Sequence, residues 1–466
     1  MSGHDEIEAD GPDLVVAGAG GGLVGALRAA QLGLDVLVLE RQEHFVVGNN
    51  TAMSTAMIPG AGSRWQREQG IDDSPEQFLD DIRAKTGGDF EERIARSLVE
   101  VSARLVEWLA DDQGLELSLV EDFSYPGHSA LRCHTIPGRS GRRLLEHLVR
   151  RVRRQGRVDL VAPATLTEVV TGDDGEVVGV VAETPNGTEE ISCRSLLLAT
   201  NGFGADEELV SRHLPTIAGA VYHGSSGSQG DALRIGERLG AATAYLDAYQ
   251  GHAALAHPGA TLAGWATVMH GGFLVDADGR RFGDETTGYS EFAESVLREA
   301  GGEAWLVLDQ RIHEACLSFQ DFRDTVESGG VRRGDTVEEV AARSGVDAAG
   351  LAATLRSTAR CAAGEETDPW GRTSWEAALA PPYEMVRVRP ALFHTQGGLL
   401  VDGHARVLDQ QDRPIPGLYA SGGAAAGISG HGASGYLAGN GLLPAFGLAL
   451  LAAEHVAASR SRSTAS

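Results

Sequence analysis

Short apolar runs and helical spacing alternate along the chain and predict its elements. Residues 14–17 and 36–39 are uninterrupted apolar runs, which are typical of parallel strands buried on both faces. Between them, apolar positions from 23 to 34 recur at the spacing of a helix. The order strand, helix, strand predicts a βαβ unit near the start of the chain.

Polar caps and apolar stripes predict further elements. The expected helices lie at 74–87, 91–111, 139–154 and 336–362. Short alternating strands fill 158–199, with a turn at 172–175. A last apolar helix is expected to open after Asn440 and Gly441, so that its positive end points back at the glycine-rich loop before it.

A glycine-rich turn joins the first strand to the first helix. Gly18, Gly20 and Gly22 follow the strand directly, and Glu40 ends the second strand 22 residues beyond Gly18. Glycines let the backbone approach a pyrophosphate, and an acid at this distance accepts from ribose hydroxyls. The pattern predicts an adenine dinucleotide site. A second frame, Gly20, Gly22 and Gly25, fits GxGxxG literally but starts later.

Composition narrows the class of protein. The chain has 466 residues, enough for two or three cores, and 61 of them are glycine. Its formal charge of −26 opposes binding to nucleic acid and to anionic lipid. No apolar run is expected to span a bilayer, and the polar residues 1–12 are unlike a signal peptide. We expect a cytoplasmic enzyme with disordered tails at 1–12 and 459–466.

The four cysteines, Cys133, Cys193, Cys316 and Cys361, are scattered along the chain. None belongs to a CxxC pair or has a histidine at metal-ligand spacing. The sequence therefore predicts neither a disulfide framework nor a metal site.

Several separate stretches resemble one family, the FAD-dependent fumarate reductase and succinate dehydrogenase flavoproteins, which also includes the 3-ketosteroid dehydrogenases. After the glycine turn, the matching stretches are GNNTAMSTAM, LLLATNGFGAD, QGDALRIGERLGA, GRRFGDE, HTQGGLLVD, IPGLYASGG and HGASGYLAGNGLLPAFGLALLAA. The likeness runs from about 13 to 457 and is nearer to the ketosteroid branch than to the dicarboxylate branch.

The resemblance implies an α/β fold. A Rossmann-like FAD-binding domain would be built from both ends of the chain, 13–248 and 391–458, with an inserted α+β capping domain at 249–390. Substrate would lie between the two, and hydride would pass between flavin N5 and a carbon beside a carbonyl-activated double bond. No second strand-glycine-helix unit is present for NAD(P)H, so the electron acceptor or donor is left open.

Cofactor contacts carry over from the family position by position. Gly18, Gly20 and Gly22 would meet the pyrophosphate, and Glu40 would meet the ribose. The other residues implied to line FAD are Arg41, Asn50, Thr51, Ser54, Thr200, Gly230, Asp231, Gly422, Asn440, Gly441 and Leu442. The GNNTAMST loop holds no histidine for covalent attachment, which implies a non-covalent flavin.

Two substrate classes compete. His252 and His394 match the two substrate-binding histidines of the dicarboxylate enzymes, which favours a fumarate reductase or succinate oxidase. Those enzymes also clamp carboxylates with arginines. Gly435 and Tyr436 stand in place of arginine in the last motif, and residues 265–276 carry none. An unpaired buried charge costs about 3–5 kcal/mol, so we favour the other class.

The favoured class is a ketone α,β-dehydrogenase or the reverse enzyme, an enone reductase. Tyr436, with a backbone N–H at Asn440 or Gly441, resembles the carbonyl-gripping pair of the ketosteroid dehydrogenases. Tyr125 resembles a substrate-wall tyrosine of the same group. The expected substrate is therefore a small carbonyl compound.

The group that moves the proton is less defined by the sequence. His270 and Tyr249, both expected in the capping domain, are our candidates. A third class of function, a flavin electron carrier without a substrate, would account for the cofactor signature alone.

Overall fold

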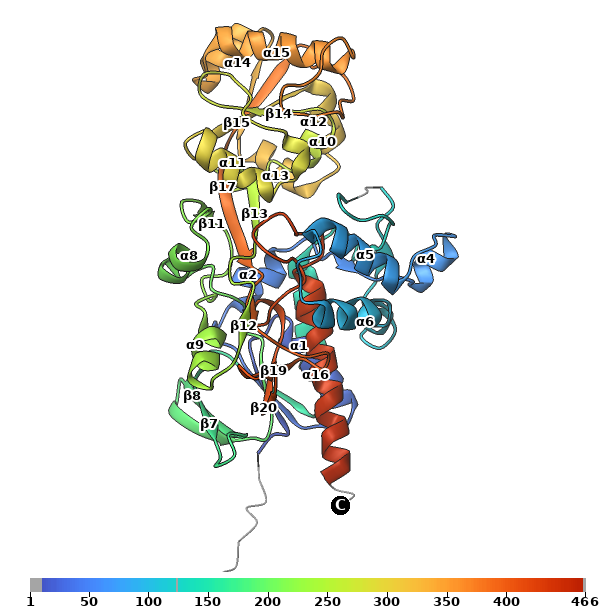
Figure 1. The fold of residues 1–466 in the computed structure, drawn as a ribbon, viewed down its shortest axis with the longest axis vertical. Coiled ribbons are helices and arrows are strands. Elements are labelled where there is room, and N and C mark those ends of the chain that lie inside the picture. Colours follow the sequence, from blue (N-terminus) through green and yellow to red (C-terminus); the bar gives the residue numbers. More distant parts are fainter. Residues whose placement is uncertain (1–10, 123–124, 464–466) are drawn as a thin grey trace, which may run out of the picture. The chain divides into compact units, whose positions relative to one another are not determined.

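The chain divides into two compact units. The computed structural model describes residues 11–122 and 125–463 (Figure 1). Unit 1 comprises Met1–Leu214, Gly224–Tyr249 and His394–Ser466, and unit 2 comprises Pro215–His223 and Gln250–Phe393. The sequence analysis placed 215–223 in the first domain. These residues belong to unit 2, where strand β11 (Val221–Tyr222) pairs with strand β17 (Tyr383–Thr395).

A six-stranded sheet forms the centre of unit 1. Its strands, in spatial order, are β19 (Arg406–Leu408), β20 (Pro414–Ala420), β10 (Leu196–Leu198), β1 (Leu14–Ala17), β2 (Val36–Leu39) and β6 (Val158–Val161). The pairs from β20 to β6 are all parallel, whereas β19 is antiparallel to β20. Strands from both ends of the chain therefore present their carboxyl ends along one edge.

Two helices that are distant in sequence pack together in unit 1. Helix α1 (Gly22–Gln31) follows the glycine turn and lies beside α16 (Leu442–Ser463) (Figure 1). α16 begins after Asn440 and Gly441, as predicted, but it extends to Ser463, into the tail that was expected to be disordered.

No apolar run of the sequence was expected to be long enough to span a bilayer, but α16 is. By length and composition alone, Leu442–Ser461 is long and apolar enough to cross a membrane. Within the protein, 61% of the most apolar 18-residue stretch of this helix is buried. Core helices of globular proteins can be equally long and apolar. Leu443, Phe446 and Leu450 of α16 are fully buried in the core of unit 1.

Smaller elements complete unit 1. Its other helices are α2 (Phe45–Gly48), α3 (Asn50–Met53), α4 (Arg64–Glu68), α5 (Pro75–Thr86), α6 (Glu92–Asp111), α7 (Gly141–Val152), α8 (Glu207–His213), α9 (Asp231–Arg238) and the 3₁₀ turn η2 (Gly422–Ala424). Its small sheets comprise β3 (Ile58–Pro59), β5 (Cys133–Thr135) and β4 (Ser118–Leu119), then β7 (Thr165–Thr171), β8 (Val177–Thr184) and β9 (Gly187–Ser192), and the pair β12 (Thr243–Ala244) and β18 (Gly398–Leu399). The four cysteines of the chain are buried free thiols.

Unit 2 is built on a mixed sheet. Its order is β11, β17, β15 (Ala304–Asp309) and β14 (Phe273–Val275), with β13 (Tyr249–Ala256) and β16 (Val331–Gly334) also paired to β17. Its helices are α10 (Ala266–Met269), η1 (Glu285–Thr287), α11 (Glu291–Glu299), α12 (Gln310–Cys316), α13 (Gln320–Glu327), α14 (Val337–Ser344) and α15 (Ala348–Ala362). The amphipathic helices predicted around 336–362 are α14 and α15, which are separated where Gly345 ends α14 in the left-handed conformation, with φ 75°.

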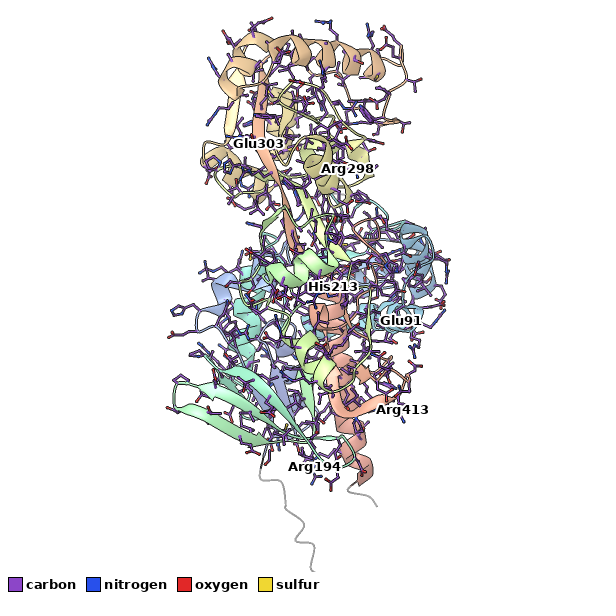
Figure 2. All side chains as sticks on the ribbon, turned by 60° about the vertical axis from the view of Figure 1, so that its left-hand side comes forward. Glu91, Arg194, His213, Arg298, Glu303 and Arg413 are labelled. Carbon is purple, nitrogen blue, oxygen red and sulfur yellow. The ribbon has the colours of Figure 1, made fainter. Side chains whose placement is uncertain are left out.

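Charged side chains cover the surface of both units. Arg194 and Arg413 are exposed on unit 1, and Arg298 is exposed on unit 2 (Figure 2). The buried arginines described below are exceptions to this distribution, and each is held by carboxylates.

Candidate active site

The carboxyl edge of the unit 1 sheet gathers several of the predicted cofactor residues. Gly18 follows β1, Glu40 follows β2, Thr200 lies two residues beyond β10, and Ser421 follows β20. Because these strands are parallel and adjacent, the four residues lie along the same edge. Ligands of open α/β sheets bind outside this edge.

The glycine turn is shaped by close backbone contacts. Gly18 has φ +107°, and a Cβ atom on it would lie 2.3 Å from the Ala199 carbonyl oxygen. A Cβ atom on Gly20 would lie 3.1 Å from Thr51 Oγ1, so this glycine faces a polar side chain of the following loop. On Gly22 it would lie 2.5 Å from Val16 Cγ1, so Gly22 lets α1 pack closely on β1.

Glu40 is held inside unit 1 by backbone donors. Its Oε2 accepts from the Ala19 N–H at 2.8 Å and its Oε1 from the Gln42 N–H at 2.9 Å. Burial raises the pKa of Glu40, although the two N–H groups and Arg41 oppose this shift. The same carboxylate thus braces the glycine turn and stands where a ribose acceptor is predicted.

Several other residues that were predicted to contact FAD are bonded to one another or to neighbouring residues of unit 1. Arg41 forms an ion pair with Asp231 at 3.0 Å, and Gly230 opens helix α9 just before that aspartate, with φ 76°. Asn50 Oδ1 accepts from the Ser225 N–H at 2.5 Å. Ser54 donates to the Thr51 carbonyl at 2.7 Å.

Five buried polar atoms of unit 1 have no hydrogen-bond partner among the described residues. Four of them are Thr200 Oγ1, Ser421 Oγ, Gln396 Nε2 and Asn440 Oδ1, and the fifth is Nδ1 of His134 in β5. Buried polar groups are almost always paired in folded proteins, so such orphans mark places where a ligand or water completes the structure. The residues present therefore fit a polar cofactor along the sheet edge and beside the last loop.

The last loop brings a histidine and a tyrosine together. The rings of His394 and Tyr436 lie edge to face, with centroids 6.3 Å apart. A Cβ atom on Gly441 would lie 3.2 Å from His394 Nε2, so the start of α16 is next to this ring. Burial lowers the pKa of His394 to about 4, which keeps the ring neutral near pH 7. Leu442 is buried at the first position of α16, and Gly422 contacts Ala445 of the same helix.

Tyr125 belongs to a small apolar cluster in unit 1. It packs against Met57, Val120, Cys133 and Ala438. Burial raises the pKa of its phenol, and the nearby Tyr436 adds to the shift. Tyr125 thus lies close to the loop that carries Tyr436, and its role as a substrate wall stays a prediction.

His128 was missed by the sequence analysis, although it lies three residues beyond Tyr125. Its Nε2 is 3.0 Å from the Ala438 carbonyl oxygen, and its Nδ1 is 3.4 Å from Arg132 Nη1. Arginine only donates, so Nδ1 accepts and Nε2 carries the hydrogen. Arg132 is in turn buried between Asp73 at 2.9 Å and Asp81 at 2.5 Å. A buried ion network therefore fixes the histidine that holds the last loop.

The other predicted histidine, His252, lies in unit 2 within an aromatic cluster. Its ring stacks on Tyr289 and Phe393, with centroids 5.1 and 5.4 Å away, and meets the edge of Trp265 at 6.0 Å. Burial lowers the pKa of His252 to about 3, with His223 adding to the shift. Its Nδ1 accepts from the Ala254 N–H at 3.1 Å, which leaves Nε2 as a neutral donor.

The two proton-transfer candidates have different surroundings. His270 of unit 2 is part-exposed and its Nδ1 lies 2.8 Å from Glu376 Oε1. Tyr249 was expected in the capping domain, but it is the last residue of a segment of unit 1. Its backbone N–H donates to Gly432 at 3.1 Å, and its side chain is fully buried.

The buried arginines of unit 2 are neutralised within the unit. Arg281 pairs with Glu285 at 2.7 Å and with Asp368. Arg372 lies 3.3 Å from Glu285 and donates to the Gly272 and Val268 carbonyls. The charges of both arginines are thus compensated by acids of unit 2 itself.

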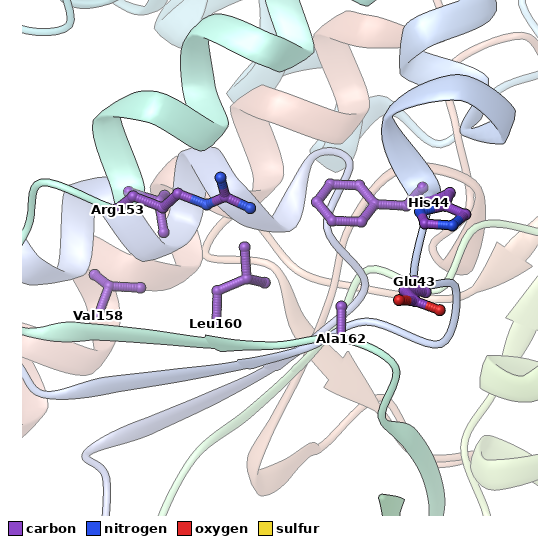
Figure 3. A pocket seen from close by; sticks show the side chains of 8 residues that line it. Glu43, His44, Arg153, Val158, Leu160 and Ala162 are labelled. Atoms are coloured by element: carbon purple, nitrogen blue, oxygen red, sulfur yellow. The ribbon is translucent and has the colours of Figure 1, made fainter. Parts of the chain in front are cut away.

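A separate cavity of about 370 Å³ lies beside the edge strand β6 (Figure 3). Arg153 borders it on one side and His44 on the other (Figure 3). Its remaining lining residues are Glu43, Phe45, Val152, Val158, Leu160 and Ala162. None of the predicted site residues lines this cavity, so we assign it no role in the reaction.

Residues 13–442 match the protein family described as FAD binding domain. The chain belongs to this family. It is an FAD-dependent oxidoreductase, and the predicted cofactor, family resemblance and α/β fold with a capping domain are confirmed.

Named relatives of this FAD binding domain protein include both enzyme branches. It is 27% identical over 423 residues to a probable fumarate reductase, Ifc3, of Shewanella frigidimarina. The alignment covers 90% of this chain and 70% of that protein. The open form of a flavocytochrome c3 fumarate reductase superposes with a TM-score of 0.83 at 26% identity, covering 96% of this chain and 78% of that one.

The other branch is represented by a solved dehydrogenase of similar length. The 3-ketosteroid-Δ4-(5α)-dehydrogenase of Rhodococcus jostii RHA1, in complex with 4-androstene-3,17-dione, has a TM-score of 0.75 at 26% identity. The alignment covers 98% of this chain and 99% of that one. Taken together, the relatives' names favour the fumarate reductase alternative over the ketone class that we preferred from the sequence.

Proposed function

We propose that the chain transfers hydride between FAD and a carbon–carbon bond next to a carbonyl group, as an enone reductase or ketone α,β-dehydrogenase. Bound FAD would supply the two-electron chemistry. The residues of unit 1 would hold it through the glycine turn, Glu40 and the orphaned polar atoms at the sheet edge. We also propose that the flavin is held non-covalently, because residues 48–55 contain no histidine.

The observation that carries the substrate class is the state of the buried cations. Arg132, Arg281 and Arg372 have buried side chains, and each already contacts at least one carboxylate. His252 and His394 are buried and neutral at pH 7. A dicarboxylate would have to displace an internal acid or remain unpaired, which is costly. A neutral carbonyl compound needs only neutral hydrogen-bond donors.

Tyr436 and the backbone N–H of Gly441 would supply those donors, because the alternative donor, the Asn440 N–H, already donates to the Leu437 carbonyl. Charge grows on the carbonyl oxygen as the neighbouring C–H bond gives up its proton, or as hydride arrives at the conjugated carbon. A phenol O–H and a backbone N–H held in place would therefore bind the transition state more tightly than the ground state. Electrostatic stabilisation of this kind is usually the largest single contribution to catalysis.

A dicarboxylate reductase is the second candidate, because the names of the relatives favour it. His252 and His394 are compatible with either class, since a neutral histidine donates to a carboxylate as well as to a ketone. The two candidates differ in the charge of the substrate. A dicarboxylate would have to bind without an unpaired arginine, whereas a neutral carbonyl compound would not need one.

The deciding experiment compares substrates with one preparation of the FAD-loaded protein. Cyclic enones are tested as oxidants of the dithionite-reduced enzyme, and cyclic ketones as reductants of a dye. Fumarate and succinate are tested in parallel under the same conditions. We expect turnover on the neutral compounds and little on the dicarboxylates. Brisk fumarate reduction with no reaction of any enone would establish the second candidate instead.

The mode of flavin binding has its own test. Acid precipitation of the yellow protein should release FAD into the supernatant. Flavin that stays with the precipitate would show a covalent bond.

A further inference from the structure

Three side chains of unit 1 form a hydrogen-bonded chain with an open end on each side. Asn440 Nδ2 donates to Ser429 Oγ at 2.9 Å, and Ser429 Oγ donates to Gln396 Oε1. All three residues are at least 96% buried. The opposite atoms of the two amides, Gln396 Nε2 and Asn440 Oδ1, have no partner among the described residues.

The central hydroxyl decides what the open ends must be. A serine O–H has one hydrogen, so Ser429 donates to one amide and accepts from the other. If both amides were turned over, the hydroxyl would donate to Asn440 and accept from Gln396. Either way, one amide N–H₂ group and one amide oxygen remain unpaired. The chain therefore presents one donor and one acceptor whichever way the amides are assigned.

Three backbone groups beside these side chains have partners. The Gln396 N–H donates to the Ala248 carbonyl at 2.8 Å, and its carbonyl accepts from the Gly427 N–H at 2.7 Å. The Asn440 N–H donates to the Leu437 carbonyl at 3.0 Å. Both side-chain amides are excluded from solvent, so a ligand that contacts them must itself be buried there.

One donor and one acceptor presented by the same buried network are complementary to an imide edge. The pyrimidine ring of a flavin has this edge: its N3–H donates, and the carbonyl oxygens on either side accept. The chain binds FAD, and Asn440 lies two residues before α16 in the unit whose sheet edge also carries unpaired hydroxyls.

We propose that Gln396 and Asn440 clamp the pyrimidine edge of the flavin, with Ser429 as the positioning residue that sets one amide to donate and the other to accept. The clamp rests on FAD binding and is independent of the substrate class.

The test uses two probes, FAD and FAD methylated at N3, which lacks the donor. Apoprotein prepared by mild release of FAD is titrated with each probe, and dissociation constants are read from flavin fluorescence. The parent should bind FAD at least tenfold more tightly than the methylated probe. Gln396→Met and Asn440→Leu should each weaken FAD about tenfold, and one of them should abolish the preference for FAD. That variant identifies the amide whose oxygen accepts from N3–H.

Ser429→Ala provides a milder variant in case the amide replacements do not fold. Without the hydroxyl either amide can turn over, so the preference for FAD over the methylated probe should shrink. Gln410→Met is the control, because Gln410 is an exposed glutamine of unit 1 whose side chain donates to the Ala241 carbonyl at 3.0 Å. It should leave both dissociation constants unchanged.

The proposal is overturned if the Gln396 and Asn440 variants fold and keep the parent's affinity and preference. It is also overturned if they raise the KM for a substrate while FAD binding is unaltered, because the amides would then face the substrate. Failure of the enone assay alone would leave these titrations, and hence the clamp, intact.

Discussion

The two units satisfy their buried polar groups in different ways. In unit 2, Arg281 and Arg372 share Glu285 and Asp368, so the buried charges neutralise one another within the unit. In unit 1, hydroxyl and amide groups at the sheet edge and in the last loop are left without a partner among the described residues. The unpaired buried polar atoms of unit 2, among the described residues, are the indole N–H groups of Trp265, Trp305 and Trp375 and the Ser344 hydroxyl. The buried charges of unit 2 are thus paired within the unit, whereas unit 1 leaves amides and hydroxyls that a cofactor could pair with.

The buried histidines of the two units also differ in their surroundings. Unit 1 has His128, His134 and His394, whose burial lowers the pKa of each to about 4. Unit 2 has His252, whose pKa is lowered to about 3, and aromatic rings surround it instead of polar groups. An aromatic wall with one neutral donor suits a flat, uncharged substrate, and the polar unit suits a cofactor.

The largest expected effect is on the stability of unit 2. Glu285→Gln leaves Arg372 buried without a carboxylate, whereas Arg281 keeps Asp368. Such a change typically costs about 3–5 kcal/mol, which urea unfolding would measure. Glu303→Gln breaks the more exposed pair with Arg387 and serves as the control, with a much smaller loss. Equal losses in the two variants would show that the buried network does not act as a closed unit.

The next effect concerns turnover and belongs to unit 1. Tyr436→Phe removes one of the two proposed carbonyl donors and should lower turnover of a ketone or enone about 10²–10³-fold. FAD should stay bound, since the phenol is proposed to contact the substrate. Tyr419→Phe removes another part-buried phenol, which lies 2.9 Å from His455, and should leave turnover near the parent's. A fully active Tyr436 variant would remove the carbonyl-gripping role.

Local signals were sufficient to predict the framework of both units. Helix α5 begins after Ser74, whose side chain accepts from the Gln77 N–H, and ends at Gly87 in the left-handed conformation, as its sequence indicates. The βαβ unit from β1 to β2 is also present. Gly345 gives the same kind of stop signal, since it ends α14 in the left-handed conformation before α15 begins.

The polar contacts of the site could not be predicted in the same way. Ser429 lies 33 residues from Gln396 and 11 from Asn440, and no spacing in the sequence marks the three as one chain. The ion pair between Arg41 and Asp231 likewise joins two residues that were each assigned to the cofactor. The tertiary fold decides which side chains bind each other and which remain free to bind a ligand.

A smaller effect tests the cofactor side of unit 1. Glu40→Gln removes the charge that accepts from the Ala19 and Gln42 N–H groups and from the predicted ribose. FAD affinity should fall by about 1.5–3 kcal/mol, or roughly tenfold to a hundredfold, in a fluorescence titration. Glu43→Gln, three residues further on, should not change it. Unchanged affinity in the Glu40 variant would limit this residue to bracing the turn.

The smallest expected effect, counted per residue, is the change in the free energy of unfolding with pH. A neutral histidine with a lowered pKa leaves the unfolded chain binding more protons than the folded one between pH 6.5 and 4. Stability is therefore complete above about pH 6.5 and is lost as the pH falls towards 4. Between pH 7 and pH 6, each buried histidine should lower the free energy of unfolding by less than about 1 kcal/mol. Three of these histidines, His128, His134 and His394, are in unit 1 and one, His252, is in unit 2, so unit 1 should lose more stability than unit 2.

Unfolding in urea at pH 7 and pH 6 measures this loss, and single variants assign it to a unit. His134→Gln in unit 1 and His252→Gln in unit 2 should each reduce the difference in stability between the two pH values, because one buried neutral ring is gone. His404→Gln is the control, since His404 is exposed and its loss should not alter the difference. If the parent were equally stable at both pH values, or more stable at pH 6, these rings would not be held neutral and the contrast between the units would not extend to their histidines.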